Sequence, residues 1–127
     1  MIKSMLALCL GAAAGALLRW FLGLALNACW AWLPLGTLAA NLLGGYLAGF
    51  AVSLFGAMPA LGAELRLLVM TGFLGALTTF STFSLELCSM LQEQRFLAAL
   101  TALLLHVCGS VAAVALGMLT FAMIRQA

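Results

Sequence analysis

Four hydroxyl side chains and two phenyl rings occupy six consecutive positions, Thr78-Thr79-Phe80-Ser81-Thr82-Phe83. This stretch lies within an apolar run from about Leu65 to Met90. Hydroxyl groups can donate hydrogen bonds to an ion or accept them. The edge of a phenyl ring carries the positive end of its quadrupole, so an anion can lie against it. The stretch therefore suits the binding of a partly dehydrated ion, and its donors favour a small anion, although hydroxyl oxygens could also serve a cation.

The backbone of this stretch is a poor candidate for a regular helix. Gly72 and Gly75 lie just upstream, and its three threonines are β-branched and stiff at χ1. We therefore expect a helix that is broken in the middle of the membrane. Each unpaired backbone group in lipid costs several kcal/mol, so such breaks persist where the backbone lines a cavity or binds an ion. The alternative is a continuous kinked helix whose hydroxyls bond to its own carbonyls.

The composition identifies an integral membrane protein. Of 127 residues, 67% are hydrophobic and 6% are charged, whereas a soluble domain has about 25% charged residues. A net charge of +2 is too small to indicate a nucleic-acid partner. The chain has no Asp, and its Glu residues are Glu64, Glu86 and Glu93. Most chemistry that needs two carboxylates, or a metal ion held by Asp, is therefore excluded.

The four cysteines form no CxxC pair, and three of them lie in apolar runs. We expect them to be small buried apolar side chains rather than disulfide partners or metal ligands.

Four segments are long enough to cross a hydrocarbon core of about 30 Å, which takes roughly 20 residues. They cover about residues 4–26, 35–55, 65–91 and 96–124 of a single transmembrane domain, 1–127. The predicted fold is an all-α integral membrane protein with four transmembrane helices, of which the third is broken at mid-membrane.

The first span carries a small-residue pair followed by a charge. Gly11 and Gly15 have the GxxxG spacing that lets helices approach closely. Arg19 follows four residues later on the same face. It either extends to the lipid headgroups or lies in an aqueous vestibule, where it would raise the local anion concentration.

The second span places Thr37, Asn41, Gly45 and Gly49 on one helical face. The amide of Asn41 carries two N–H donors. We expect Thr37 and Asn41 to line a pore, and the alternative for Asn41 is a structural hydrogen bond between helices.

His106 and Ser110 lie one turn apart in the fourth span. His106 is either a proton relay or a hydrogen-bonded interface residue. Glu86 follows the predicted break by less than a turn. It is either the coupling carboxylate of a transporter or the end of a polar track.

The basic residues give only a weak preference for one orientation in the membrane. Lys3, Arg66 and Arg125 lie on one side, and Arg95 lies on the other with or without Arg19. This balance predicts insertion in both orientations and hence an antiparallel dimer. Four helices pack around a filled core, so a pathway should lie between subunits. Its candidate lining consists of Asn41, Phe80, Ser81, Thr82, Phe83 and Ser110.

Three motifs in order resemble those of the Fluc (CrcB) fluoride channel family. They are Gly11-x-x-x-Gly15-x-x-x-Arg19, Gly36-Thr37-Leu38-x-x-Asn41-x-x-Gly44 and Gly72-x-x-Gly75-x-x-Thr78-Thr79-Phe80-Ser81-Thr82-Phe83-Ser84-x-Glu86. The third motif is specific, whereas the first two would be weak alone. The resemblance also covers chain length and the number of spans.

The resemblance implies a passive fluoride-selective channel, with no enzymatic step. It would export F⁻ through two pores of a dual-topology antiparallel homodimer in the bacterial inner membrane. By this likeness the ring edges of Phe80 and Phe83 meet the ion, Asn41 donates to it, and Arg19 lies in the vestibule. The carbonyls of Gly75 and Thr78 would hold a structural Na⁺ at the dimer centre, as oxygen ligands suit a hard cation. The polar track would include Ser81, Thr82, Glu86, His106 and Ser110.

Two other functions fit the residues. A small proton-coupled exporter of cationic compounds would use Glu86 as its coupling group. A non-transporting assembly subunit would use the polar track only to pack against a partner.

Overall fold

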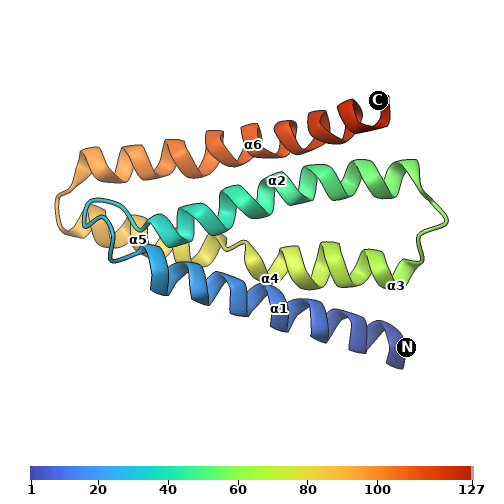
Figure 1. Cartoon of the computed structure of the whole chain (residues 1–127). Helices are drawn as coiled ribbons and strands as arrows, with labels where there is room; N and C mark the ends of the chain where they lie inside the picture. Colours follow the sequence, from blue (N-terminus) through green and yellow to red (C-terminus); the bar gives the residue numbers. More distant parts are fainter. Residues whose placement is uncertain (127) are drawn as a thin grey trace.

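The computed structural model describes residues 1–126, and these are helical with short connections and no strand. Four stretches are long and apolar enough to cross a membrane. The start of α1 and the end of α6 lie at the same end of the bundle, as four crossings require (Figure 1). The elements are α1 (Ile2–Leu26), α2 (Leu35–Ala57), α3 (Ala63–Arg66), η1 (Leu67–Leu74), α4 (Gly75–Leu77), α5 (Phe80–Gln92) and α6 (Phe96–Gln126). The predicted all-α class with four membrane-spanning segments is confirmed.

The third span consists of α3, η1, α4 and α5, and it is interrupted between α4 and α5 (Figure 1). Thr78 has φ −77° and ψ 151°, and Thr79 has φ −149° and ψ 118°. Both residues are therefore extended. The predicted break is confirmed, and the alternative of a continuous kinked helix is wrong.

Ahead of the break, Leu67–Leu74 is wound as a π-helix, a conformation that nothing in the sequence pattern predicts. Such segments are rare and often lie at functional sites. The segment is apolar at almost every position. Its side-chain pattern therefore shows no periodicity from which the winding could be read.

Glycines let α1 approach the first half of the third span. A Cβ added to Gly11 would collide with the Leu68 carbonyl oxygen, and one added to Gly15 would collide with that of Phe73. The predicted GxxxG pair is thus confirmed as a surface for close helix packing.

A second set of glycines joins α2 to α6. A Cβ on Gly49 would collide with the carbonyl oxygen of Val114, and one on Gly117 would collide with that of Tyr46. The two glycines of the predicted face of α2, Gly45 and Gly49, therefore pack against α6.

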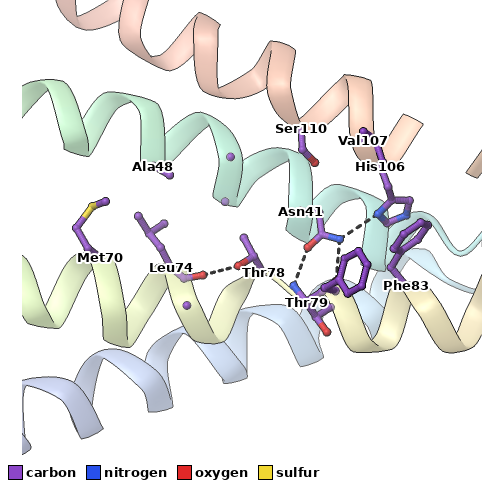
Figure 2. Close-up of a pocket in the computed structure, with 14 residues that line it drawn as sticks. Asn41, Ala48, Met70, Leu74, Thr78, Thr79, Phe83, His106, Val107 and Ser110 are labelled. Atoms are coloured by element: carbon purple, nitrogen blue, oxygen red, sulfur yellow. Dashed lines mark hydrogen bonds between the residues drawn. The ribbon is translucent and has the colours of Figure 1, made fainter. Parts of the chain in front are cut away.

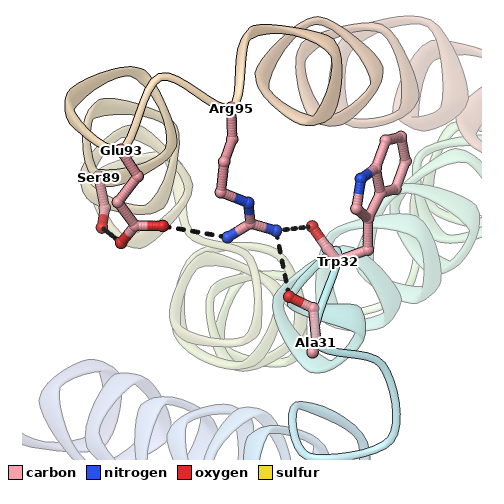
Figure 3. Close-up of polar contacts among 5 residues, drawn as sticks. All are labelled: Ala31, Trp32, Ser89, Glu93 and Arg95. Atoms are coloured by element: carbon pink, nitrogen blue, oxygen red, sulfur yellow. Dashed lines mark hydrogen bonds and ion pairs between the residues drawn. The ribbon is translucent and has the colours of Figure 1, made fainter.

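Arg95 ties together two connections at the end of the bundle opposite the termini (Figures 1 and 3). Its guanidinium donates to the carbonyl oxygens of Ala31 at 3.1 Å and Trp32 at 2.7 Å, and it pairs with Glu93 at 3.2 Å. The α1–α2 connection is thereby held against the turn between α5 and α6.

The expectation that the cysteines are buried is wrong. Cys9, Cys29, Cys88 and Cys108 are all exposed on this chain. Because much of the surface of a membrane protein faces lipid or other helices, an apolar residue can meet its preference there without being inside the bundle.

We predict that Gly49→Ala destabilises the protein, whereas Gly56→Ala, also in α2, does not. The methyl group at Gly49 would push against Val114 backbone, while nothing lies within 4 Å of a Cβ at Gly56. Overpacking of this kind costs about 1–3 kcal/mol, which exceeds the gain of about 1 kcal/mol in helix propensity. The free energy of unfolding measured by titration with dodecyl sulfate in mixed micelles tests this, and equal values for the two variants would contradict it.

Candidate functional site

The side chain of Asn41 on α2 closes the break in the third span (Figure 2). The Thr79 N–H donates to Asn41 Oδ1 at 2.7 Å, and Asn41 Nδ2 donates to the Thr79 carbonyl oxygen at 3.0 Å. A carboxamide carries both an acceptor oxygen and N–H donors, so it can pair with the N–H and the C=O of one extended residue. Asn41 thus replaces hydrogen bonds that the interrupted helix cannot make.

The break also redirects two backbone amides away from particular carbonyls. In a continuous helix the Thr79 N–H would bond to Gly75 O and the Thr82 N–H would bond to Thr78 O. Here Thr79 N–H donates to Asn41, and Thr82 N–H donates to Thr79 Oγ1 at 3.1 Å, which makes Thr79 the N-cap of α5. The carbonyls of Gly75 and Thr78 therefore lose their helical partners.

The second Nδ2 donor of Asn41 is directed at His106 on α6. The distance from Asn41 Nδ2 to His106 Nδ1 is 3.0 Å. The His106 side chain is buried and stacked on the Phe83 ring, with 4.3 Å between ring centroids. Both amide donors of Asn41 are thus engaged within the chain, so direct donation from Asn41 to an ion stays a prediction that requires one of these bonds to open.

A cavity of about 510 Å³ lies beside the break, and we name it the His106 cavity. Phe80 is 78% exposed, whereas Phe83 is 4% exposed. The two rings meet at 65° with 5.8 Å between centroids. Among the predicted site residues, the structure brings Asn41, Gly75, Thr78, Phe80, Phe83, His106 and Ser110 together around this cavity.

A second cavity of about 490 Å³, the Arg19 cavity, lies where Arg19, Thr37, Thr82 and Glu86 meet. Thr37 Oγ1 donates to Glu86 Oε1 at 2.5 Å, which links α2 to α5. Thr79 lines both cavities. Apart from Ser81, the predicted site residues thus divide between two cavities that share Thr79.

Ser81 is the predicted site residue that lines neither of these two cavities. It is exposed on α5, and its hydroxyl lies 3.3 Å from Thr79 Oγ1. Its predicted place along the pathway remains a prediction.

Sequence reasoning overlooked Thr79 and Asn27 as site residues. Thr79 directly precedes the restarted helix, a position where a hydroxyl commonly caps the free amides. Asn27 ends α1, and its Oδ1 accepts from the Gly36 N–H at 2.8 Å. Pro34, the N-cap of α2, makes no side-chain cap bond, so a cap had to come from elsewhere. Asn27 also lines the Arg19 cavity.

Comparison with known proteins identifies the family from residues 6–118. These match the profile described as CrcB-like protein, Camphor Resistance (CrcB). The chain belongs to the CrcB family. The predicted resemblance is therefore confirmed.

Relatives of this CrcB protein match over nearly its whole length. It is 59% identical over 125 residues to a protein of Desulfovibrio desulfuricans, covering 98% of this chain and 97% of the relative. It is 55% identical over 121 residues to one of Pseudomonas putida, covering 95% of each. It is 52% identical over 126 residues to one of Chromobacterium violaceum, covering 99% and 100%. All three relatives are named fluoride-specific ion channel FluC.

We predict that Thr79→Val lowers the free energy of unfolding by about 1 kcal/mol, because it removes the N-cap oxygen without changing side-chain shape. Thr101→Val is the matched control, since the Thr101 hydroxyl donates only to Leu97 O within α6. Unfolding titrations of both variants in mixed micelles test this. A Thr101→Val protein as destabilised as Thr79→Val would show that the capping bond is unimportant.

Proposed function

We propose that this CrcB protein is a passive fluoride-selective channel of the bacterial inner membrane, with two pores in an antiparallel homodimer. The observation that carries the proposal is the lining of the His106 cavity. It combines hydroxyl, imidazole and phenyl groups, and no carboxylate is among the described residues that line this cavity. Such a lining favours an anion over a cation. The relatives named fluoride-specific channels support the choice of fluoride.

Fluoride must lose much of its hydration to enter so apolar a site. Donor groups and the positive edges of Phe80 and Phe83 replace part of the lost water. Movement needs no chemical step, because the membrane potential supplies about 2.3 kcal/mol per charge per 100 mV. A family whose members are named ion channels is also a non-enzyme family.

Arg19 supplies positive charge to the Arg19 cavity, which Glu86 also lines. Partial burial of both charges in one cavity suits a vestibule where Arg19 raises the local concentration of anions. Glu86 is bound by the Thr37 hydroxyl, in keeping with a place at the end of the polar track.

A second copy of the chain would complete the pathway. Phe80 is 78% exposed and Val107 is 50% exposed, although both line the His106 cavity. Gly75 at the same cavity is exposed as well. A partner protomer would cover these residues, and the weak charge bias would allow it to insert in the opposite orientation.

The carbonyls of Gly75 and Thr78 fit a hard cation such as Na⁺. The amides that would bond to them in a helix donate elsewhere. The described residues contain no cluster of three His, Cys, Asp or Glu side chains that could hold a metal. Backbone oxygens are therefore the available ligands. A bound cation would take the place of the N–H donors that these carbonyl oxygens have lost.

We predict that liposomes containing the protein release fluoride and retain chloride, and that Phe80→Ile and Phe83→Ile each slow fluoride release about tenfold or more. Loss of an edge contact worth about 1.5 kcal/mol corresponds to this factor. Phe121→Ile is the control, because Phe121 packs edge-on to Phe50 and lines a different cavity. A fluoride electrode and a matched chloride assay give both rates.

Unchanged fluoride release from both phenylalanine variants would contradict the ring-edge mechanism. Glu86→Gln and removal of the proton gradient separate the channel from the coupled exporter. A channel still passes fluoride when no proton gradient is present. A coupled exporter loses transport in the Glu86→Gln variant and also without the gradient.

We also predict that replacing Na⁺ by N-methylglucamine destabilises the purified protein. An ion that binds only the folded state stabilises it by RT ln(1 + [Na⁺]/Kd), so the unfolding midpoint should rise as Na⁺ is restored at constant ionic strength. A midpoint independent of Na⁺ would argue against the cation site.

A further inference from the structure

The backbone N–H and C=O of Thr79 determine how the Asn41 carboxamide is oriented. A peptide N–H can only donate and its carbonyl can only accept, so Asn41 Oδ1 must face the N–H and Nδ2 must face the oxygen. The remaining Nδ2 proton is then directed at His106 Nδ1, 3.0 Å away. That nitrogen must accept, and a neutral ring that accepts at Nδ1 carries its proton on Nε2.

His106 Nε2 has no hydrogen-bond partner among residues 1–126, and its bonded nitrogen is Nδ1. Yet no enclosed side-chain nitrogen or oxygen in this part of the chain lacks a partner. Nε2 therefore reaches accessible space, and His106 lines the His106 cavity. Phe83 stacks on the face of the imidazole, which leaves the ring edge free to point a donor outward.

We propose that His106 presents its Nε2–H to the permeating fluoride, and that Asn41 is the positioning residue that fixes this tautomer. The inference rests on the proposed fluoride channel and assigns a donor within it. The hydrogen bonds run from the Thr79 N–H to the Asn41 amide, from the amide to the His106 ring, and from the ring to the ion. Each bond polarises the next, so the terminal N–H is a better donor than an isolated imidazole.

This arrangement is incompatible with His106 as a proton relay. A relay needs a neighbour that can give up or take a proton, and the neighbour of Nδ1 is a carboxamide N–H. An amide does not exchange its proton in this way near neutral pH. His106 thus acts as a fixed donor.

The chain contains a single histidine, so labelling with ¹⁵N-histidine reports on His106 alone. We expect nitrogen NMR of the protein in lipid nanodiscs to show a protonated, pyrrole-type Nε2 and an unprotonated, pyridine-type Nδ1. The couplings of each nitrogen to the ring C–H protons distinguish the two. Fluoride should shift the Nε2 signal, while the same concentration of chloride should not. A proton on Nδ1, or an Nε2 signal that fluoride leaves unchanged, would overturn the inference.

Two variants of His106 test the donor by flux. His106→Gln retains an acceptor for Asn41 and an N–H for the cavity, whereas His106→Leu retains neither. We expect the Gln variant to release fluoride about tenfold faster than the Leu variant, as for one strong hydrogen bond. Size-exclusion chromatography checks that both are folded.

The outcomes separate the two proposals. Equal fluoride release from the Leu, Gln and unaltered proteins would overturn the role of His106 and leave the channel standing. No fluoride release from the unaltered protein would overturn the channel itself and this inference with it, whatever the tautomer. The NMR measurement on the unaltered protein decides the tautomer even if a variant fails to fold.

Discussion

The pairing of the Asn41 side chain with both backbone groups of Thr79, its N–H and its C=O, is the interaction on which the site depends. It occurs where the third span has no helix, among apolar segments, so each of these backbone groups would cost several kcal/mol if left unpaired. The same pairing withdraws an amide from the Gly75 carbonyl and orients the donor that reaches His106. A change at this one point would therefore alter the backbone, the candidate cation site and the candidate anion site together.

Asn41 can make this pairing only because the helices approach one another closely. A Cβ on Gly44, less than one turn after Asn41, would collide with Thr78 Cγ2. On the opposite side of the third span, Gly11 and Gly15 bring α1 against the carbonyls of Leu68 and Phe73. The short side chain of Asn41 spans the gap because glycines remove the side chains that would widen it. Helix packing in this protein thus serves the hydrogen bonding of the break as well as van der Waals contact.

The break and its surroundings could be predicted from composition, because glycines and β-branched hydroxyl residues in an apolar run disagree with a lipid-facing helix. The close helix packing at Gly11 and Gly15 could be predicted from their spacing. The hydrogen-bond partners of Asn41 could not be predicted. A polar residue in a span indicates that hydrogen bonds are needed, but it does not identify the groups that form them. The π-helix of Leu67–Leu74 could not be predicted either, because an almost uniformly apolar segment shows no hydrophobic periodicity. The separation of Arg19 and Glu86 from His106 and Phe83 depends on the path of the backbone through the break, which residue types do not encode.

The break gives the backbone carbonyls a preference for cations and leaves the surrounding side chains with a preference for anions. Side-chain acceptors, Asn41 Oδ1 and Thr79 Oγ1, take the freed amides, so the backbone is left with surplus carbonyl oxygens. Surplus carbonyls favour a cation, whereas the donors and ring edges around them favour an anion. A cation at Gly75 and Thr78, where we propose one, would lie in the wall of the same cavity that His106 and Phe83 line. Its charge would then offset part of the cost of dehydrating an anion there, because charges interact strongly across a region that excludes water. In this arrangement the interrupted helix is the reason that one apolar bundle can accommodate ions of both signs.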